Sequence, residues 1–158
     1  MVTDKSKSEK VLESMNILLV GNNPIELSSI LNTIKGLPGR IISTETAFDL
    51  TSIWQRLIKF KPNYILIDDN IGYHELTRTV GVLSSNPKTR EIPITVLKNS
   101  NYTESAFTND IADYLLKQNL TTESLYIALK NSLKFKRTRE FLSRAYAKRK
   151  RELLKLVR

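Results

Sequence analysis

Short apolar runs alternate along this chain with segments whose apolar positions recur at helical spacing. Residues 17–20 and 64–67 are continuous apolar runs, and the second ends at Asp68; such runs are typical of strands buried on both faces of a parallel sheet. Residues 40–44, 92–97 and 112–116 are three further short strand patterns. Because the strands alternate with helices, the pattern predicts an α/β fold with a doubly wound, five-stranded parallel sheet.

The helices between these strands have start and stop signals. The first begins at Asn23, a capping residue, with Pro24 at the first helical position. The second ends near residues 61–62, since the residue before a proline avoids the α region. A third helix follows Gly72, and residues 102–110 form a weak, polar fourth helix.

The fifth helix has no breaker between Thr121 and Arg158. It is therefore expected to continue for about 38 residues, roughly 57 Å at a rise of about 1.5 Å per residue, which outruns a domain of this size. A partial apolar stripe lies along its second half: Leu142, Ala145, Leu153 and Leu156. Arg149 and Glu152 interrupt this stripe, so the pattern is compatible with a coiled coil without establishing one.

Charge divides the chain into segments. We expect a flexible N-terminal segment at residues 1–14, one domain at residues 15–133 and a basic helical extension at residues 134–158. The net charge is +9, and the extension holds 11 of the 25 Lys and Arg residues but only 2 of the 16 Asp and Glu residues. The rest of the chain is therefore neutral, and the excess charge lies in the extension.

The extension admits several interpretations. Its central basic positions are Lys136, Arg137, Arg139, Arg144, Lys148, Arg149, Lys150 and Arg151. Such a run serves as a solvated stalk or dimerisation element, binds nucleic acid, or binds an acidic protein or anionic lipid. No helix-turn-helix or zinc-finger pattern accompanies it.

Composition narrows the classes of function. The chain has no cysteine, which excludes disulfides, a thiol nucleophile and cysteine-based metal sites. The only histidine, His74, has no second nitrogen or sulfur ligand nearby in the sequence, so we expect a surface residue and no metal site. The N-terminus lacks a secretory signal and no run of about 20 apolar residues is present, so the cytoplasm is the expected location.

Polar residues follow the strands where a parallel sheet presents its carboxyl edge. Ligands of open α/β sheets bind at that edge, and Asp68 ends the third strand there. Lys98 and Lys117 follow the fourth and fifth strands, so two ammonium groups are expected near Asp68 and Asp69. Asp68 is the first candidate for chemistry, and the alternative is an acid that caps the strand and pairs with a lysine. An enzyme is not expected, because the chain lacks a paired nucleophile and base.

This arrangement resembles the response-regulator receiver domain of two-component (phosphorelay) signal transduction, over residues 16–133. Two segments carry the resemblance, residues 62–68 and residues 112–117. The resemblance implies a flavodoxin-like receiver fold, with Asp68 at the phosphoacceptor position and Tyr114 as the switch aromatic. It also implies a set of acceptor-site neighbours: Asn22, Asp69, Asn70, Lys98 and Lys117.

Four positions depart from the family pattern. Gly21 and Asn22 stand where receivers have the acidic pair that holds Mg²⁺. Lys98 replaces a Thr or Ser, and Gln118 replaces the proline after the lysine. We therefore expect an atypical, pseudo-receiver-like domain without a cofactor, with weak Mg²⁺ binding and with weak or absent phosphorylation. Lys98 is expected within about 4 Å of Asp68 or Asp69, as a built-in counter-ion.

The resemblance also implies how such a domain acts. A protein partner, or a second copy in a homodimer, would bind the surface of the fourth helix, fifth strand and fifth helix. The alternative function is that of a nucleic-acid-binding protein acting through the basic C-terminal helix. Salt dependence separates the two, because binding to phosphates weakens steeply with salt.

Overall fold

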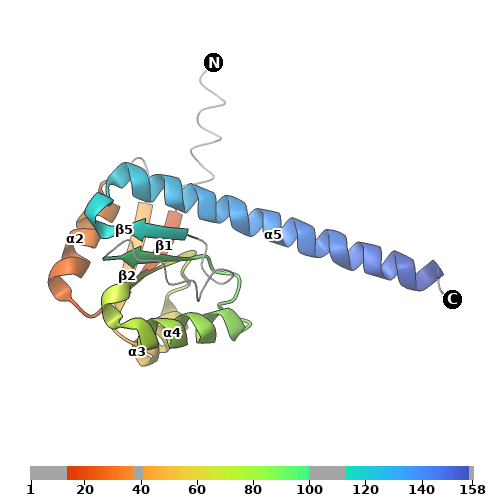
Figure 1. Ribbon diagram of the computed structural model, residues 1–158, viewed down its shortest axis with the longest axis horizontal. Helices are drawn as coiled ribbons and strands as arrows, with labels where there is room; N and C mark the ends of the chain where they lie inside the picture. Colours follow the sequence, from red (N-terminus) through yellow and green to blue (C-terminus); the bar gives the residue numbers. More distant parts are fainter. Residues whose placement is uncertain (1–13, 38–40, 100–112, 157–158) are drawn as a thin grey trace, which may run out of the picture.

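The computed structural model describes residues 14–37, 41–99 and 113–156 (Figure 1). Five parallel strands form one sheet in the order β2-β1-β3-β4-β5. Their bounds are β1 (Ser14–Val20), β2 (Ile41–Ala47), β3 (Tyr64–Asp68), β4 (Ile94–Lys98) and β5 (Asp113–Leu116). This is the flavodoxin-like order, so the predicted doubly wound sheet is confirmed.

Helices cover both faces of the sheet (Figure 1). They are α2 (Pro24–Lys35), α3 (Leu50–Lys59), α4 (Tyr73–Ser85) and α5 (Thr122–Leu156), with short 3₁₀ helices η1 (Asp69–Ile71) and η2 (Lys117–Asn119). Helices α3 and α4 pack on one face, and α2 and α5 pack on the other. The expected fourth helix at residues 102–110 and the N-terminal segment before Ser14 lie outside the described residues.

The central strand β3 shows how the sequence positions the site. All of its side chains are buried, and they alternate between the two faces. Ile65 and Ile67 pack on the side of α3 and α4, whereas Tyr64 and Leu66 pack on the side of α2 and α5. Asp68 continues this second set, so its carboxylate lies on the side of α2 and α5.

The start of α2 has the cap that the sequence predicts. The Asn23 side chain accepts hydrogen bonds from the backbone N–H groups of Ile25 (3.0 Å) and Glu26 (3.3 Å), and Pro24 occupies the first helical position. This cap fixes where the first turn of α2 lies relative to the end of β1. It therefore also sets the position of Glu26 at the carboxyl edge of the sheet.

Strand β2 is the largest departure from the expected element bounds. It runs from Ile41 to Ala47, three residues past the predicted end, because β1 pairs with it along its whole length. The added residues 45–47 include two polar residues, Glu45 and Thr46, so an apolar run cannot reveal this part of an edge strand.

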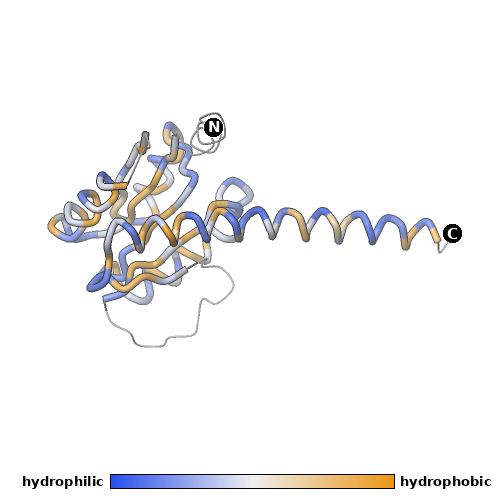
Figure 2. The backbone as a smooth tube through the Cα atoms, turned by 90° about the horizontal axis from the view of Figure 1, so that it is seen from above, coloured by the Kyte–Doolittle hydropathy of each residue, from blue (hydrophilic) through white to orange (hydrophobic). Residues whose placement is uncertain are grey.

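Helix α5 packs on the sheet along its first turns and projects beyond them (Figure 1). Its first turns bury Leu125, Ala128, Leu129 and Ser132 against the sheet. Beyond Lys134 the helix projects from the body (Figure 1), and Figure 2 shows apolar positions recurring among hydrophilic ones along this part. The described helix has 35 residues, so the expected long helix is confirmed.

A buried set of hydroxyl groups joins α5 to the sheet. The Tyr64 hydroxyl in β3 is hydrogen-bonded to the Thr95 hydroxyl in β4, and Ser132 in α5 donates to Tyr64 Oη at 3.4 Å. All three side chains are buried. Buried hydroxyls that keep their partners stabilise one arrangement, because leaving them unpaired costs free energy.

Replacing Tyr64 with phenylalanine tests this connection. Tyr64→Phe removes a buried partner from Thr95 and Ser132, and we expect the free energy of unfolding to fall by about 1–3 kcal/mol. Tyr146→Phe is the control, because Tyr146 is 71% exposed on the extension, and we expect it to be neutral. Urea denaturation followed by circular dichroism measures both. Equal stability of the two variants would show that the hydroxyl set does not hold α5.

Candidate functional site

The site lies at the carboxyl edge of the sheet, where four chain segments meet. Asp68 ends β3, and Asn70 follows in η1. Lys117 begins η2 directly after β5, and Glu26 lies in the first turn of α2. Parallel strands bring their carboxyl ends to one edge, which explains why residues so distant in sequence meet here.

Lys117 joins two carboxylates at this edge. Its ammonium nitrogen forms an ion pair with Asp68 Oδ1 and a second one with Glu26 Oε2 at 2.9 Å. Asp68 is fully buried, and its Oδ1 also accepts a hydrogen bond from the Asn70 backbone N–H at 3.0 Å. Asp68 Oδ2 is buried and has no hydrogen-bond partner among the described residues. The candidate acceptor is therefore already neutralised by a cation of the chain itself.

Burial and this ion pair act on both ionisable groups. Burial raises the pKa of Asp68 above its usual value, and the hydrogen bonds from Lys117 and Asn70 offset this only in part. Burial alone would lower the pKa of Lys117, but the bonds to Asp68 and Glu26 outweigh burial and raise that pKa. Lys117 consequently remains an ammonium group throughout the neutral pH range.

The other oxygen atoms around the site are bonded to side-chain amides. Asn70 donates to Glu26 Oε2, and Asn22 donates to the Asn70 carbonyl at 3.4 Å. Asn99 donates to Asp69 through its backbone N–H (3.1 Å to Oδ2) and its amide nitrogen (2.9 Å to Oδ1). The structure thus brings together most of the expected neighbours of Asp68, and it bonds their oxygens to donors of the chain.

Lys98 takes a different place from the expected one. Leu97 packs with α2 and α5, and it is the partner of Asp68 across the paired strands. Since side chains alternate along a strand, Lys98 points to the other side of the sheet. There its ammonium nitrogen lies 4.6 Å from the centroid of the Tyr114 ring. Of the two lysines, Lys117 and not Lys98 is the counter-ion of Asp68.

Glu26 is the site residue that sequence reasoning missed. It lies in the first turn of α2, three residues after the Asn23 cap, and it binds both Lys117 and Asn70. Its signal was available, because an acid in the first turn after a strand end lies at the carboxyl edge of the sheet. His74 is exposed, as expected for a surface residue.

The side chains present do not fit a divalent cation held by carboxylates. No group of three or more His, Cys, Asp or Glu side chains suited to a metal ion occurs within residues 14–37, 41–99 and 113–156. A Cβ atom at Gly21 would lie 2.6 Å from Leu27 Cδ2 and 3.2 Å from Asp68 Cβ. Leu27 therefore fills the space that an acidic side chain at this position would need.

Solved structures share the fold of this chain. The N-terminal domain of a response regulator receiver protein from Methanoculleus marisnigri matches with a TM-score of 0.57 and 24% identity, covering 75% of this chain and 96% of its own. The signal receiver domain of an HD domain-containing protein from Pseudomonas fluorescens matches with a TM-score of 0.66 and 17% identity, covering 80% and 99%. The chain has the fold of response-regulator receiver domains.

A third similar structure is a receiver domain that contains a metal ion. The receiver domain of a sensor histidine kinase from Pseudomonas aeruginosa, with a magnesium ion coordinated in its active site cleft, has a TM-score of 0.55 and 22% identity, covering 74% of this chain and 96% of its own. These receiver structures are covered almost completely, so part of this chain has no counterpart in them. No family model and no curated protein matches the chain.

Removing the cation from Asp68 should destabilise the protein in a pH-dependent way. Lys117→Met leaves the buried carboxylate unpaired, and we expect the free energy of unfolding at neutral pH to fall by about 3 kcal/mol. This loss of stability should shrink as the pH falls. Burial raises the pKa of Asp68, so its carboxyl takes up a proton as the pH falls and is then no longer an unpaired charge. Urea denaturation at several pH values measures this.

Asp68→Asn is the matched variant for this experiment. It removes the buried negative charge and leaves Lys117 paired with Glu26, so we expect a smaller loss of stability with little dependence on pH. If Lys117→Met lowers the free energy of unfolding by the same amount at every pH, the unpaired carboxylate is not the cause of its effect.

Proposed function

We propose that the chain is an atypical receiver domain of two-component signalling that acts through protein contacts and does not catalyse an external reaction. The observation that carries the proposal lies beside the buried Asp68: Leu27 fills the space next to Gly21, and Asn22 donates to the Asn70 carbonyl, so neither position supplies an acid. Phosphorylation of Asp68 is weak or absent in this proposal. Magnesium binding is also weak, since Gly21 and Asn22 stand where the family has acidic residues.

Phosphoryl transfer makes demands that this site opposes. Catalysis of the transfer depends on positioned cations that neutralise charge on the phosphoryl oxygens, and Mg²⁺ prefers carboxylate and carbonyl oxygens for its coordination. Here the Asn70 carbonyl accepts from Asn22, and the Glu26 carboxylate accepts from Lys117 and Asn70. Among the described residues of the site, Asp68 Oδ2 is buried without a hydrogen bond, and it lies beside an ammonium group that repels a metal ion.

The output surface is the one formed by α4, β5 and α5. Tyr114 in β5 packs with the residues under α3 and α4, and the Lys98 ammonium lies over its ring. A cation over an aromatic face stabilises the ring in that place. We infer that the switch aromatic keeps one position without a phosphoryl group, so the surface presents itself to a protein partner constitutively.

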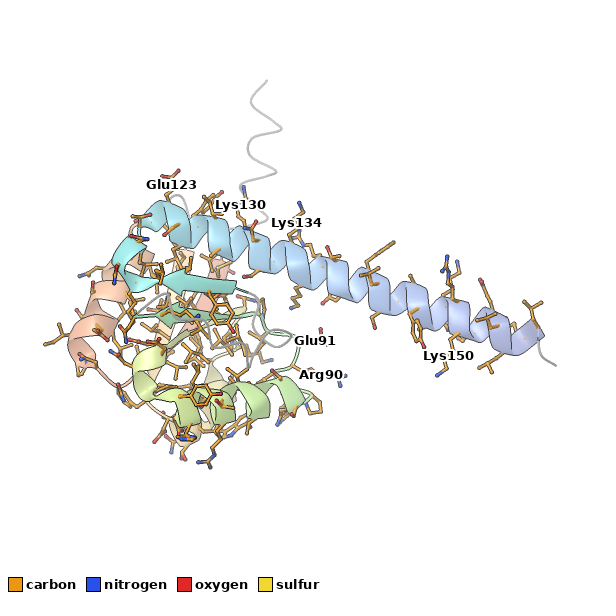
Figure 3. All side chains as sticks on the ribbon, viewed as in Figure 1. Arg90, Glu91, Glu123, Lys130, Lys134 and Lys150 are labelled. Carbon is orange, nitrogen blue, oxygen red and sulfur yellow. The ribbon has the colours of Figure 1, made fainter. Side chains whose placement is uncertain are left out.

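The alternative function, nucleic-acid binding, rests on the extension. Figure 3 shows charged side chains on several sides of the projecting helix, with Lys134 and Lys150 on opposite sides. None of the helices in the described part of the chain is long and apolar enough to cross a membrane. Binding to a DNA duplex that weakens steeply with salt, measured by fluorescence anisotropy, would favour this alternative over protein contacts.

A phosphodonor experiment tests the receiver proposal. After incubation with acetyl phosphate and Mg²⁺, we expect intact-mass spectrometry to show little adduct, because Gly21 and Asn22 stand where an acidic pair would hold the Mg²⁺ that assists phosphoryl transfer. Asp68→Asn is the control for modification at any other residue. Rapid stoichiometric phosphorylation that disappears in Asp68→Asn would contradict the proposal.

Two substitutions test why the metal site is weak. Asn22 is exposed, so Asn22→Asp has room for a carboxylate and should raise the Mg²⁺ affinity about 10-fold, a gain of roughly 1.4 kcal/mol. Gly21→Asp should fail to do so and should lower stability, because Leu27 occupies the space around its Cβ. Isothermal titration calorimetry with MgCl₂ measures the affinities. Strong Mg²⁺ binding by the unmodified chain would overturn this account.

A further inference from the structure

The projecting part of α5 carries a line of exposed apolar side chains. Leu142 is 60% exposed, Tyr146 is 71% exposed and Leu153 is 62% exposed. With Arg149 and Leu156 they recur at intervals of four and three residues, which places them on one side of a helix. We call these five residues the α5 seam. The seam includes Tyr146 and leaves Glu152 outside it, so only one charged residue interrupts the heptad pattern.

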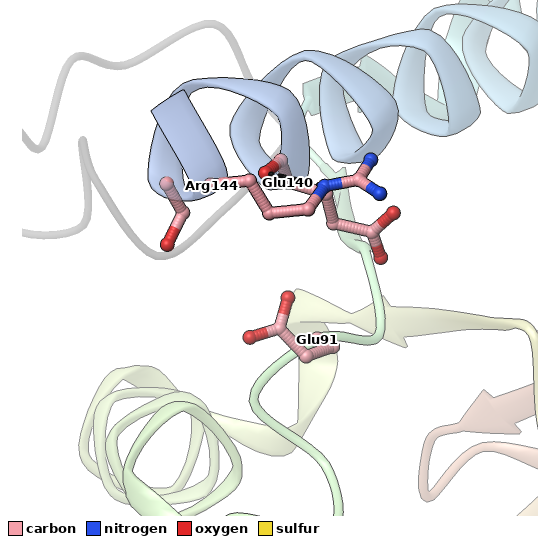
Figure 4. A pocket seen from close by; sticks show the side chains of 4 residues that line it. Glu91, Glu140 and Arg144 are labelled. Carbon is pink, nitrogen blue, oxygen red and sulfur yellow. Dashed lines mark hydrogen bonds between the residues drawn. The ribbon is translucent and has the colours of Figure 1, made fainter. Parts of the chain in front are cut away.

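The α5 seam does not face the body of the domain. Glu140, Ser143 and Arg144 line a hollow whose opposite side is formed by Glu91, in the loop before β4 (Figure 4). Because successive residues of a helix are separated by about 100°, these three lie on a different side of α5 from most of the seam. The turns of the extension that line this hollow therefore present polar side chains to the body, and the α5 seam is open.

Charged residues are arranged so that the α5 seam can be covered by a similar helix. In the heptad defined by the seam, the flanking positions are Ser143, Ala145, Lys150 and Glu152. The remaining basic residues of this stretch lie on the outer side: Arg144, Lys148, Arg151 and Lys155. Flanking residues meet across a two-helix interface, whereas outer ones remain in solvent. Two copies can thus pair without opposing their basic residues.

The position of Arg149 decides the direction of such a pair. In a parallel pair each seam residue meets its own copy, so two guanidinium groups would face each other. In an antiparallel pair centred between Ala147 and Lys148, Leu142 lies opposite the partner's Leu153. Tyr146 then lies opposite the partner's Arg149, a favourable cation–π arrangement. The antiparallel register thus gives each seam residue from Leu142 to Leu153 a compatible neighbour.

We propose that the projecting part of α5 is a homodimerisation element, which pairs antiparallel with α5 of a second copy through the α5 seam. The proposal goes beyond the proposed function, because it holds whether or not Asp68 accepts a phosphoryl group. In proteins most of the stability of a helix comes from packing of its apolar face, and pairing gives the exposed apolar residues of this helix a partner. Among possible occupants, a second copy fits because it supplies the complementary series of leucine, tyrosine and arginine.

Neighbouring apolar residues provide a matched test of the α5 seam. Light scattering of the full chain should give twice its 18.1 kDa mass. Leu142→Gln combined with Leu153→Gln should give the monomer mass. Phe141→Gln combined with Leu154→Gln should remain dimeric, because those residues are similarly exposed (65% and 59%) but lie off the seam. A monomeric native chain, or equal loss of the dimer in both variants, would overturn the proposal.

Disulfide trapping tests the direction of the pair, since the chain has no cysteine of its own. Under mild oxidation, a mixture of Leu142→Cys and Leu153→Cys chains should form a mixed disulfide dimer, because these positions face each other. Each variant alone should form little. Disulfide dimers in each variant alone would overturn the antiparallel register. A complex that appears only with added DNA, or only with an acidic protein, would overturn the second copy as the occupant.

Discussion

A buried carboxylate with a lysine of the same chain as its counter-ion is the constraint on which the rest of this structure depends. Asp68 is fully buried at the end of the central strand, and an unpaired charge there would be costly. Lys117 removes that cost, and its second ion pair with Glu26 fixes the start of α2 against the end of β5. The interaction that neutralises the acid thus also joins three elements of the fold.

Because the counter-ion belongs to the chain, it cannot leave the site as a metal ion can. The side chains around it agree with that arrangement. Leu27 fills the space beside Gly21, and Asn22 contributes an amide where a carboxylate would attract a cation. Packing and electrostatics therefore both disfavour a metal ion at this site. A single substitution changes only one of these two conditions.

The sequence predicted the sheet and most helices because their signals are local. Apolar runs identify β1 and β3, and Asn23 with Pro24 identifies the start of α2. The end of β2 was missed, since an edge strand contains polar residues and is defined by its pairing with β1. Such pairing is a long-range property that periodicity does not record.

The candidate site was predicted less completely, for two different reasons. Asp68 and Lys117 were found because each comes directly after an apolar run. Lys98 also follows a strand, but its direction depends on which face the preceding Leu97 covers, and that is known only once the helices are placed. Glu26 was missed because its role as part of a helix start concealed its position at the sheet edge.

Helix α5 connects the buried site with the exposed extension. Its first turns are held by Leu125 and Leu129 in the core and by Ser132, which donates to Tyr64 at the beginning of the strand that ends in Asp68. The helix has no Gly or Pro along its length, so the body determines the direction in which the extension projects. A surface on that extension is consequently oriented by the same packing that fixes Asp68 and Lys117.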